Sequence, residues 1–249
     1  MKWICITLNL LAAALASGSE DVNRLISDAQ KMERSGETDS AITILKEADK
    51  LSPENTEVEK LLAQQYVIKV DDETDPAAKK TLGEMALGLA RKAAEKLPDD
   101  SEAQVTLAAA YGKLCALVDP KTELEYSKQV YAEATRGLQL NPDSDFGHLI
   151  LAQWNYQMAF LNPLLKGLTA IVYGKFPPAS KEQAIAHYKR AIELAPERIV
   201  HHAEFAKALD MMGEPAAARE EWLKVTELRP VYAQDRRYQE MAYKRLEAH

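Results

Sequence analysis

The amino-acid sequence predicts an all-α protein, built as a solenoid of about five helix pairs that ends in a C-terminal capping helix. The first observation is compositional, because 249 residues that are 47% apolar and 28% charged are enough to bury a continuous core and too apolar to be disordered. The second is a series of prolines separated by 45, 44, 54 and 34 residues, at Pro53, Pro98, Pro142, Pro196 and Pro230. A recurring interval of this size is typical of helical repeat arrays.

The final interval contains the complete pattern of one repeat. Between Pro196 and Pro230, 34 residues place aromatic, small and turn residues where the tetratricopeptide repeat has its core, at Phe205, Ala206, Gly213, Ala218 and Trp222. Such a repeat is two antiparallel helices joined at a glycine and ended by a proline. One pair cannot bury its own apolar face, so the pattern predicts further pairs.

The same spacing recurs before each of the other prolines. A small residue or Val is followed by an apolar residue four positions later, a small one after three more and Pro after five. The four sets are Ala41, Leu45, Ala48 and Pro53; Ala86, Ala90, Ala93 and Pro98; Val130, Ala134, Gly137 and Pro142; and Ala184, Tyr188, Ala191 and Pro196. We therefore expect residues 17–249 to form one repeat domain, with repeats ending near 53, 98, 142, 196 and 230, and with insertions inside the longer repeats.

Helix boundaries are indicated by turn and capping residues. Gly36 is expected to make the turn of the first pair, between helices at 21–33 and 39–51. Thr56 and Ser101 each stand at the start of a pattern typical of a capping box, and Ser180 is expected to cap the helix that follows it. The charged stretch 233–246 predicts the closing helix.

The fourth repeat carries an insertion that is apolar instead of polar. Its apolar residues are Phe160, Leu164, Leu168, Ile171, Val172 and Phe176. An apolar insertion has to be buried, so it either packs as an added helix on the neighbouring repeat or lines a groove for an apolar ligand or lipid.

Residues 1–16 have the features of a secretory signal peptide. Lys2 precedes an apolar run that ends in the small residues Ala14 and Ala16, and this run is shorter than the roughly 20 residues that span a bilayer. We expect cleavage after Ala16, export (to the periplasm in a diderm bacterium) and no membrane span afterwards. A retained anchor is the alternative.

Patterns for catalysis, metals and nucleic acids are weak or missing. The formal charge is −7 and no basic stripe is present, which argues against a nucleic-acid partner. The five histidines lack zinc-binding spacing, and the acidic stretch 71–76 lacks the glycine and final glutamate of a calcium loop, so we expect a solvated loop and no metal. Cys115 is interpreted as a buried structural thiol. We expect neither a cofactor nor enzymatic activity.

Several stretches together resemble the regulator of microtubule dynamics family. They are His148-Leu149 with Trp154 and Tyr156, the insertion ending at Tyr173-Gly174, residues 176–180 and residues 184–196, with looser matches at 62–69, 80–98 and 128–142. The resemblance implies an all-helical binding protein without catalytic residues, associated in eukaryotic members with microtubules or organelle contacts. An exported protein would not meet tubulin.

Two functions of different class follow from these observations. The first is a scaffold that binds a protein or peptide on the concave surface formed by the first helix of each pair. By the repeat spacing, that surface comprises Gln64, Val67, Val105, Ala109, Leu149, Gln153, Tyr156, Ala203 and Lys207. The second is a carrier of an apolar small molecule or lipid that uses the insertion.

Overall fold

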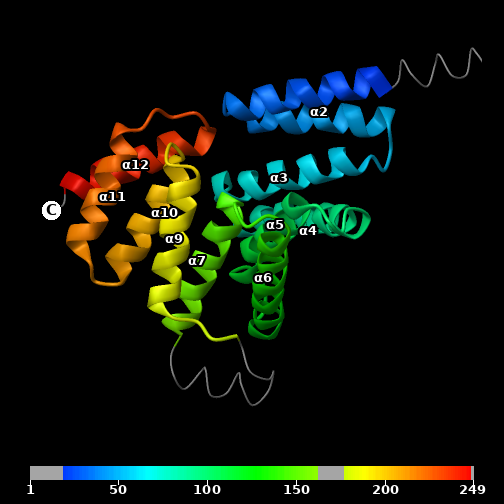
Figure 1. Ribbon diagram of the computed structural model, residues 1–249. Helices are drawn as coiled ribbons and strands as arrows, with labels where there is room; N and C mark the ends of the chain where they lie inside the picture. The colour runs from blue at the N-terminus through cyan, green and yellow to red at the C-terminus, as the bar shows by residue number, and fades with distance from the viewer. Residues whose placement is uncertain (1–18, 162–176, 248–249) are drawn as a thin grey trace, which may run out of the picture.

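The computed structural model describes residues 19–161 and 177–247, and this part of the chain consists of helices joined by turns (Figure 1). A first helix covers residues 19–34. The helices that follow are α2 (Thr38–Leu51), α3 (Thr56–Asp72), α4 (Pro76–Lys96), α5 (Ser101–Cys115), α6 (Pro120–Leu140), α7 (Asp145–Ala159), α9 (Lys181–Leu194), α10 (Ile199–Met211), α11 (Pro215–Glu227) and α12 (Ala233–Glu247).

Consecutive helices pack as pairs, as the repeat spacing predicts. α3 packs on α4, α5 on α6, α7 on α9 and α10 on α11, and neighbouring pairs stack so that α3 also contacts α5, and α5 contacts α7. The final helix, α12, packs on α11 and α10. The predicted all-α solenoid is therefore confirmed. We call α3, α5, α7 and α10 the inner helices, and α4, α6, α9 and α11 the outer helices.

The residues that define the repeat spacing are buried where each outer helix meets its inner partner. On α4, Ala86, Ala90 and Ala93 are at most 1% exposed, and Ala184 and Ala191 on α9 are fully buried. Small side chains let the two backbones approach, and larger ones at the same contact would separate the helices. Each of the five prolines follows shortly after the end of the preceding helix.

Two of the predicted turns depend on glycine. Gly36 and Gly213 have φ angles of 79° and 76°, in the left-handed region that other residues adopt only with strain. Gly36 follows the first helix, and Gly213 separates α10 from α11. The predicted roles of both glycines are confirmed.

Two of the three predicted helix caps lie one residue earlier than expected. Asn55, not Thr56, accepts the free amides at the start of α3, and Asp100, not Ser101, does so for α5. The Ser101 hydroxyl instead donates to the carbonyl of Gly137, at 2.8 Å, which ties α5 to α6. A carboxylate or amide oxygen next to each predicted hydroxyl takes the capping position. At α9 the prediction is correct, because Ser180 Oγ accepts from the amide of Gln183 at 3.2 Å.

The extra residues of the second and third repeats lengthen their helices. Both α4 and α6 have 21 residues, whereas α11 in the shortest repeat has 13. The connection between α3 and α4 is correspondingly short, from Glu73 to Asp75. The polar insertions thus form additional helical turns in α4 and α6.

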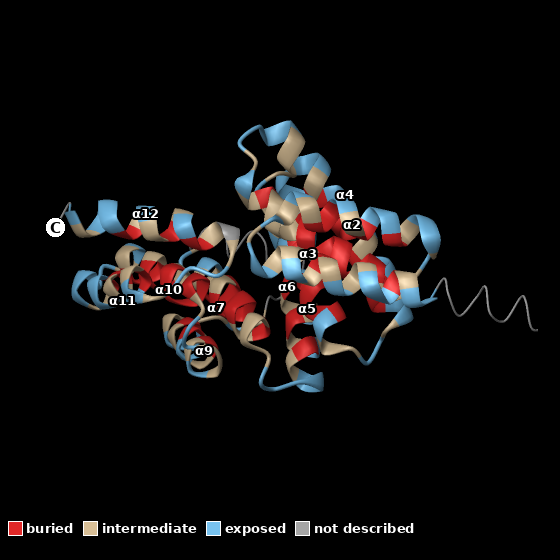
Figure 2. Ribbon diagram, turned by 90° about the horizontal axis from the view of Figure 1, so that it is seen from above, coloured by how far each residue is buried: buried red, intermediate tan, exposed pale blue. Residues whose placement is uncertain are grey.

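The core has two parts that meet at α7 (Figure 2). Ile150, Leu151 and Trp154 on α7 belong to the N-terminal part, which begins at the first helix. Leu149 and Ala152 on the same helix belong to the C-terminal part, which extends to α12. One helix that is buried on both sides therefore joins the two halves.

Parts of the predicted organisation lie outside the described residues. These are the expected signal peptide at 1–16 and the insertion residues Leu164, Leu168, Ile171, Val172 and Phe176. Phe160, at the start of the insertion, is described and is 51% exposed. Within the described ranges, every helix is too short or too polar to cross a bilayer.

Candidate functional site

The inner helices enclose a cavity of about 1060 Å³ on the concave side of the stack. Its walls combine apolar residues such as Val105 and Leu149 with amides and charged groups, so the lining has mixed polarity. Among the described residues that line it, seven are acidic and five are basic. Because all four inner helices contribute, the cavity extends across the whole stack.

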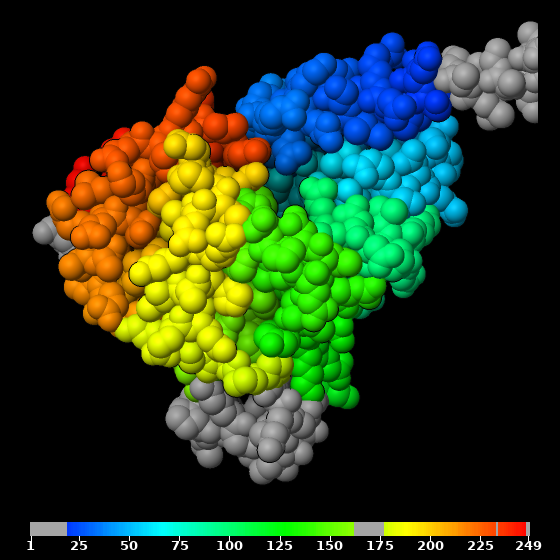
Figure 3. All heavy atoms as spheres, viewed as in Figure 1, coloured from blue at the N-terminus to red at the C-terminus, as the bar shows by residue number. Residues whose placement is uncertain are grey.

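The C-terminal helix closes one side of this cavity. Figures 1 and 3 show that the C-terminal helices curve round until they approach the N-terminal pair, which consists of the first helix and α2. Arg237 on α12 donates a hydrogen bond to the carbonyl of Asp71 at the end of α3, and its guanidinium lies 3.4 Å from the carboxylate of Asp72. Tyr238 and Met241 of α12 also line the cavity. A charged contact thus joins segments about 165 residues apart in sequence.

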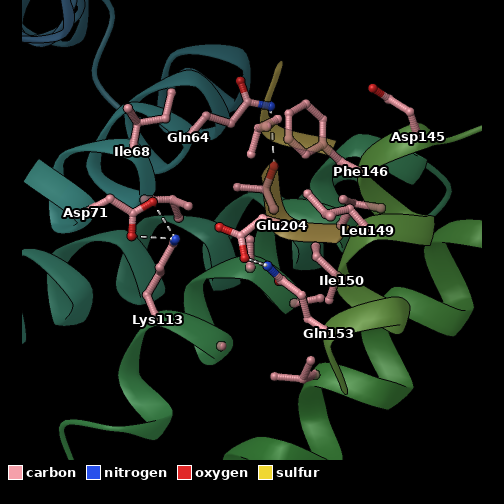
Figure 4. A pocket seen from close by; sticks show the side chains of 18 of the residues that line it. Gln64, Ile68, Asp71, Lys113, Asp145, Phe146, Leu149, Ile150, Gln153 and Glu204 are labelled. Atoms are coloured by element: carbon pink, nitrogen blue, oxygen red, sulfur yellow. Dashed lines mark hydrogen bonds and ion pairs between the residues drawn. The ribbon is translucent and has the colours of Figure 1, made fainter. Parts of the chain in front are cut away.

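Three ion pairs stand in the cavity wall, and we call them the wall pairs: Lys113 with Asp71, at 2.6 Å; Arg198 with Asp145, at 2.8 Å; and Lys207 with Glu204, at 2.8 Å. Figure 4 shows the first of them, with Lys113 of α5 reaching up to Asp71 of α3. Each wall pair neutralises one cation and one carboxylate of the lining.

Glu204 is the most connected of these carboxylates. Besides pairing with Lys207, it accepts a hydrogen bond from the amide of Gln153, at 3.1 Å (Figure 4). It also accepts one from the hydroxyl of Tyr238, at 2.9 Å. Burial and the charge of Glu204 raise the pKa of Tyr238 well above its usual value, so this hydroxyl remains a donor. α7, α10 and α12 are therefore held together by one carboxylate.

Asp145 organises the junction between α7 and α10. It lies 2.8 Å from Arg198 and accepts a hydrogen bond from Nε2 of the fully buried His201, at 2.9 Å. Burial alone would raise the pKa of Asp145, but these two partners hold it below the usual value. Burial lowers the pKa of His201, so the neutral ring donates from Nε2, and its Nδ1 has no hydrogen-bond partner.

Aromatic rings complete this junction. The guanidinium of Arg198 lies 4.7 Å from the centre of the Phe146 ring and 5.4 Å from that of Tyr232. Cation–π contacts of this kind favour a fixed guanidinium. Because Tyr232 precedes α12, the contact adds to the attachment of the C-terminal helix.

One end of the cavity is acidic. The ammonium of Lys60, which is 6% exposed, lies 3.0 to 3.1 Å from three carboxylates, those of Glu57, Asp100 and Glu102. Burial alone would lower the pKa of Lys60, but the hydrogen bonds to these carboxylates raise it above the usual value. Asp100 and Glu102 line the cavity, and so does Glu33 of the first helix.

Seven of the nine residues predicted for the concave surface line the cavity: Gln64, Val67, Val105, Ala109, Leu149, Gln153 and Lys207. The other two lie elsewhere. Ala203 is fully buried in the C-terminal core, because α10 turns this position toward its neighbours. Tyr156 packs on Phe160, with 5.0 Å between ring centres, and is not part of the lining.

The sequence pattern missed the charged groups of the site. Asp71 belongs to the acidic stretch that we expected to be a solvated loop, but α3 continues through Asp72 and directs both residues into contacts with Lys113 and Arg237. Glu204 and Arg237 carried no signal in the sequence, because charged residues on helices usually face solvent.

The described residues do not group three or more side chains that could hold a metal ion. His148 and His187 do meet, with 2.9 Å between their Nδ1 atoms, and His148 Nε2 lies 3.0 Å from the carbonyl of Pro142. Cys115 lines the cavity, and burial raises the pKa of its thiol to about 12, so it is protonated near neutral pH.

Comparison with one solved structure supports the repeat fold. A thermophilic TPR protein of Thermus thermophilus, TTC0263, superposes with a TM-score of 0.66 at 18% identity, over 91% of this chain and 99% of that one. MamA (TM-score 0.47, 16% identity, 89% and 96% covered) and the TPR protein YrrB (0.44, 14%, 92% and 97%) superpose more loosely. No curated protein sequence matches the chain.

The family comparison covers nearly the whole chain. The family described as regulator of microtubule dynamics protein 1-3 matches residues 25–249, which span from the first helix to the end of the sequence. The chain therefore belongs to the regulator of microtubule dynamics family.

Proposed function

We propose that this protein is a non-enzymatic scaffold that binds an extended segment of a partner protein in the cavity between its inner helices. The observation that carries the proposal is the cavity itself, of about 1060 Å³ and of mixed polarity, which crosses all four inner helices. Small-molecule sites are usually about 300–1,000 Å³ and mostly apolar. A cavity at the upper end of this range, with charged and amide groups among its apolar residues, suits a peptide.

The lining offers a peptide both hydrogen-bonding side chains and apolar surface. Side-chain amides at Gln64, Gln153 and Gln157 can pair with main-chain groups of a bound segment. Gln64 donates to Thr106 at 3.3 Å, which fixes its orientation. Val105 and Ala109 on α5 supply apolar surface beside these amides.

The alternative of an apolar carrier has less support. The described lining carries charged groups on α3, α5, α7, α10 and α12, and Phe160 of the insertion lies outside it. An apolar ligand would have to displace water from the wall pairs without replacing their hydrogen bonds, which is unfavourable. We therefore favour the scaffold.

Absence of catalysis is part of the proposal. A catalytic carboxylate needs a free oxygen and a suitable pKa, and three of the lining carboxylates, Asp71, Asp145 and Glu204, are committed to the cations of the wall pairs. The thiol of Cys115 is protonated near neutral pH, which does not suit a nucleophile.

Filling the cavity tests the function. We expect Ala109→Trp to reduce capture of peptides from a random dodecapeptide display library by about tenfold or more, a loss of about 1.4 kcal/mol. Lys207→Trp is a second variant, at a side chain that is 42% exposed, and thermal unfolding verifies that it is folded. Ala132→Trp, on the exposed face of α6, is the matched control and should bind as the wild type does. Equal peptide capture by all four proteins would contradict a binding site in the cavity.

We also propose that the protein is exported after cleavage behind Ala16, on the basis of the charged and apolar N-terminal residues described above. Mass spectrometry of the protein from its native cells should then find Ser17 as the first residue. A mature chain that retains residues 1–16 would contradict export by cleavage.

A further inference from the structure

The cations of the cavity are almost all engaged already. Three belong to the wall pairs, and Arg237 contacts Asp71 and Asp72. Apart from Lys79, each of these cations could bind a negative side chain of a bound segment only if an existing ion pair were broken. The existing ion pairs therefore disfavour the binding of acidic segments.

The carboxylates at the acidic end are not balanced in the same way. Lys60 is one ammonium shared by Glu57, Asp100 and Glu102, so this group keeps an excess of two negative charges. The Glu102 side chain is 62% exposed and stands at the cavity wall, where a ligand can reach it.

Glu33 adds a further carboxylate at this end. Burial raises its pKa, the side chain of Gln65 opposes this with a hydrogen bond, and the charge of Glu102 raises it again, while the more weakly acting charges of Arg198 and Arg34 lower it. Within the described residues, no lysine or arginine lies within ion-pair distance of Glu33. Glu33 and Glu102 line the same cavity, and Glu33 has no ion-paired cation of its own there.

We propose that this end of the cavity is a subsite for a lysine or arginine side chain of the bound segment, held between Glu33 and Glu102. The inference rests on the proposed function, because it assigns the chemistry of the partner at the same cavity. An ammonium or guanidinium here relieves the repulsion between the two carboxylates and pairs with a group that is already partly desolvated. The expected partner is therefore a basic extended segment.

Peptide selection on the wild-type protein tests the preference for a cation. The selected dodecapeptides should be enriched in lysine and arginine relative to the starting library. Replacing the selected lysine by norleucine, which keeps the alkyl chain and removes the charge, should weaken binding by about five- to tenfold, as expected for a partly buried ion pair. High salt should reduce the affinity of the lysine peptide more than that of its norleucine counterpart.

Variants that lack two carboxylates test whether Glu33 and Glu102 cause the preference for lysine. In Glu33→Gln/Glu102→Gln, the lysine and norleucine peptides should bind with equal affinity, because the partners of the cation are gone. The control Glu47→Gln/Glu125→Gln removes two exposed carboxylates that lie outside the cavity lining and changes the net charge equally. It should keep the wild-type preference for lysine. Thermal unfolding of both double variants verifies that each is folded.

The possible failures are distinguishable. If peptides are captured through the cavity, as judged by Ala109→Trp, but show no preference for cations, the subsite is wrong and the scaffold function stands. If the control double variant loses the preference as fully as Glu33→Gln/Glu102→Gln, net charge explains it and the subsite is wrong. If the wild-type protein captures no peptide at all, both proposals are wrong.

Discussion

The inner and outer helices of the stack bury their residues in different ways. Inner helices α3, α5, α7 and α10 each bury seven to nine residues, whereas the outer helices α6, α9 and α11 bury three each and the longer outer helix α4 buries six. An inner helix has its own partner on one side and the next repeat on the other, so little of its surface remains free. An outer helix has one buried stripe, and that stripe carries the repeat spacing seen in the sequence.

The two classes also differ in what they bury. The inner helices bury polar groups such as Gln65, Gln104 and His201 among apolar residues. Gln104, for example, donates to the carbonyls of Ala94 and Leu97 at the end of α4, where the helix leaves backbone groups without partners. Buried polar residues therefore connect repeats, and the hydrophobic pattern of the inner helices is less regular than that of the outer helices.

The largest expected effect comes from truncating a buried leucine on an inner helix. Leu114 of α5 is 1% exposed, and a Cβ atom added to Gly83 of α4 would lie 2.7 Å from its side chain, which shows how closely the two helices pack. We expect Leu114→Ala to lower the free energy of unfolding by about 2–5 kcal/mol, measured by urea denaturation.

Leu140→Ala is the matched control for this truncation. Leu140 ends the outer helix α6 and is 38% exposed, so the same change should cost clearly less. Equal losses at both sites would contradict the distinction between inner and outer helices.

A smaller effect is expected where an outer helix presents its small residues to its partner. Ala184→Leu on α9 or Ala218→Leu on α11 places a larger side chain at a contact that is now fully buried. Overpacking of this kind should cost about 1–3 kcal/mol in chemical denaturation. Ala132→Leu, on the exposed face of α6, serves as the control and should change stability little. An unchanged midpoint at both 184 and 218 would mean that the repeat spacing is wrongly placed.

The smallest effect concerns pH at the contact of α7 with α9. Burial and the nearby His148 lower the pKa of His187, so the folded protein favours the neutral ring. The unfolded chain then binds the proton first, and the contribution of His187 is present above about pH 6.5 and is lost as the pH falls below that value. Urea midpoints of His187→Gln should therefore decline less between pH 7.5 and 5 than those of the wild type. Parallel profiles would show that this pair does not influence stability.

Much of the fold follows from the sequence alone. The stripes at Ala184, Tyr188 and Ala191 and at Ala218 and Trp222 are regular because each outer helix has only one side on which burial is required. The turns at Gly36 and Gly213 follow from the need for a positive φ angle. Such features are local, so residues close together in the sequence are enough to predict them.

The candidate site depended on the tertiary structure. The repeat spacing placed seven of nine concave residues in the cavity lining, since a fixed period indicates which face of an inner helix turns inward. The spacing did not reveal that Arg237 reaches Asp71, or that Glu33 and Glu102 line the same cavity, because both depend on how far each repeat rotates relative to the one before it. That rotation accumulates over the whole stack and is set by the packing of many side chains. The sequence therefore determined the helix pairs, and only their superhelical arrangement decided which charges meet in the cavity.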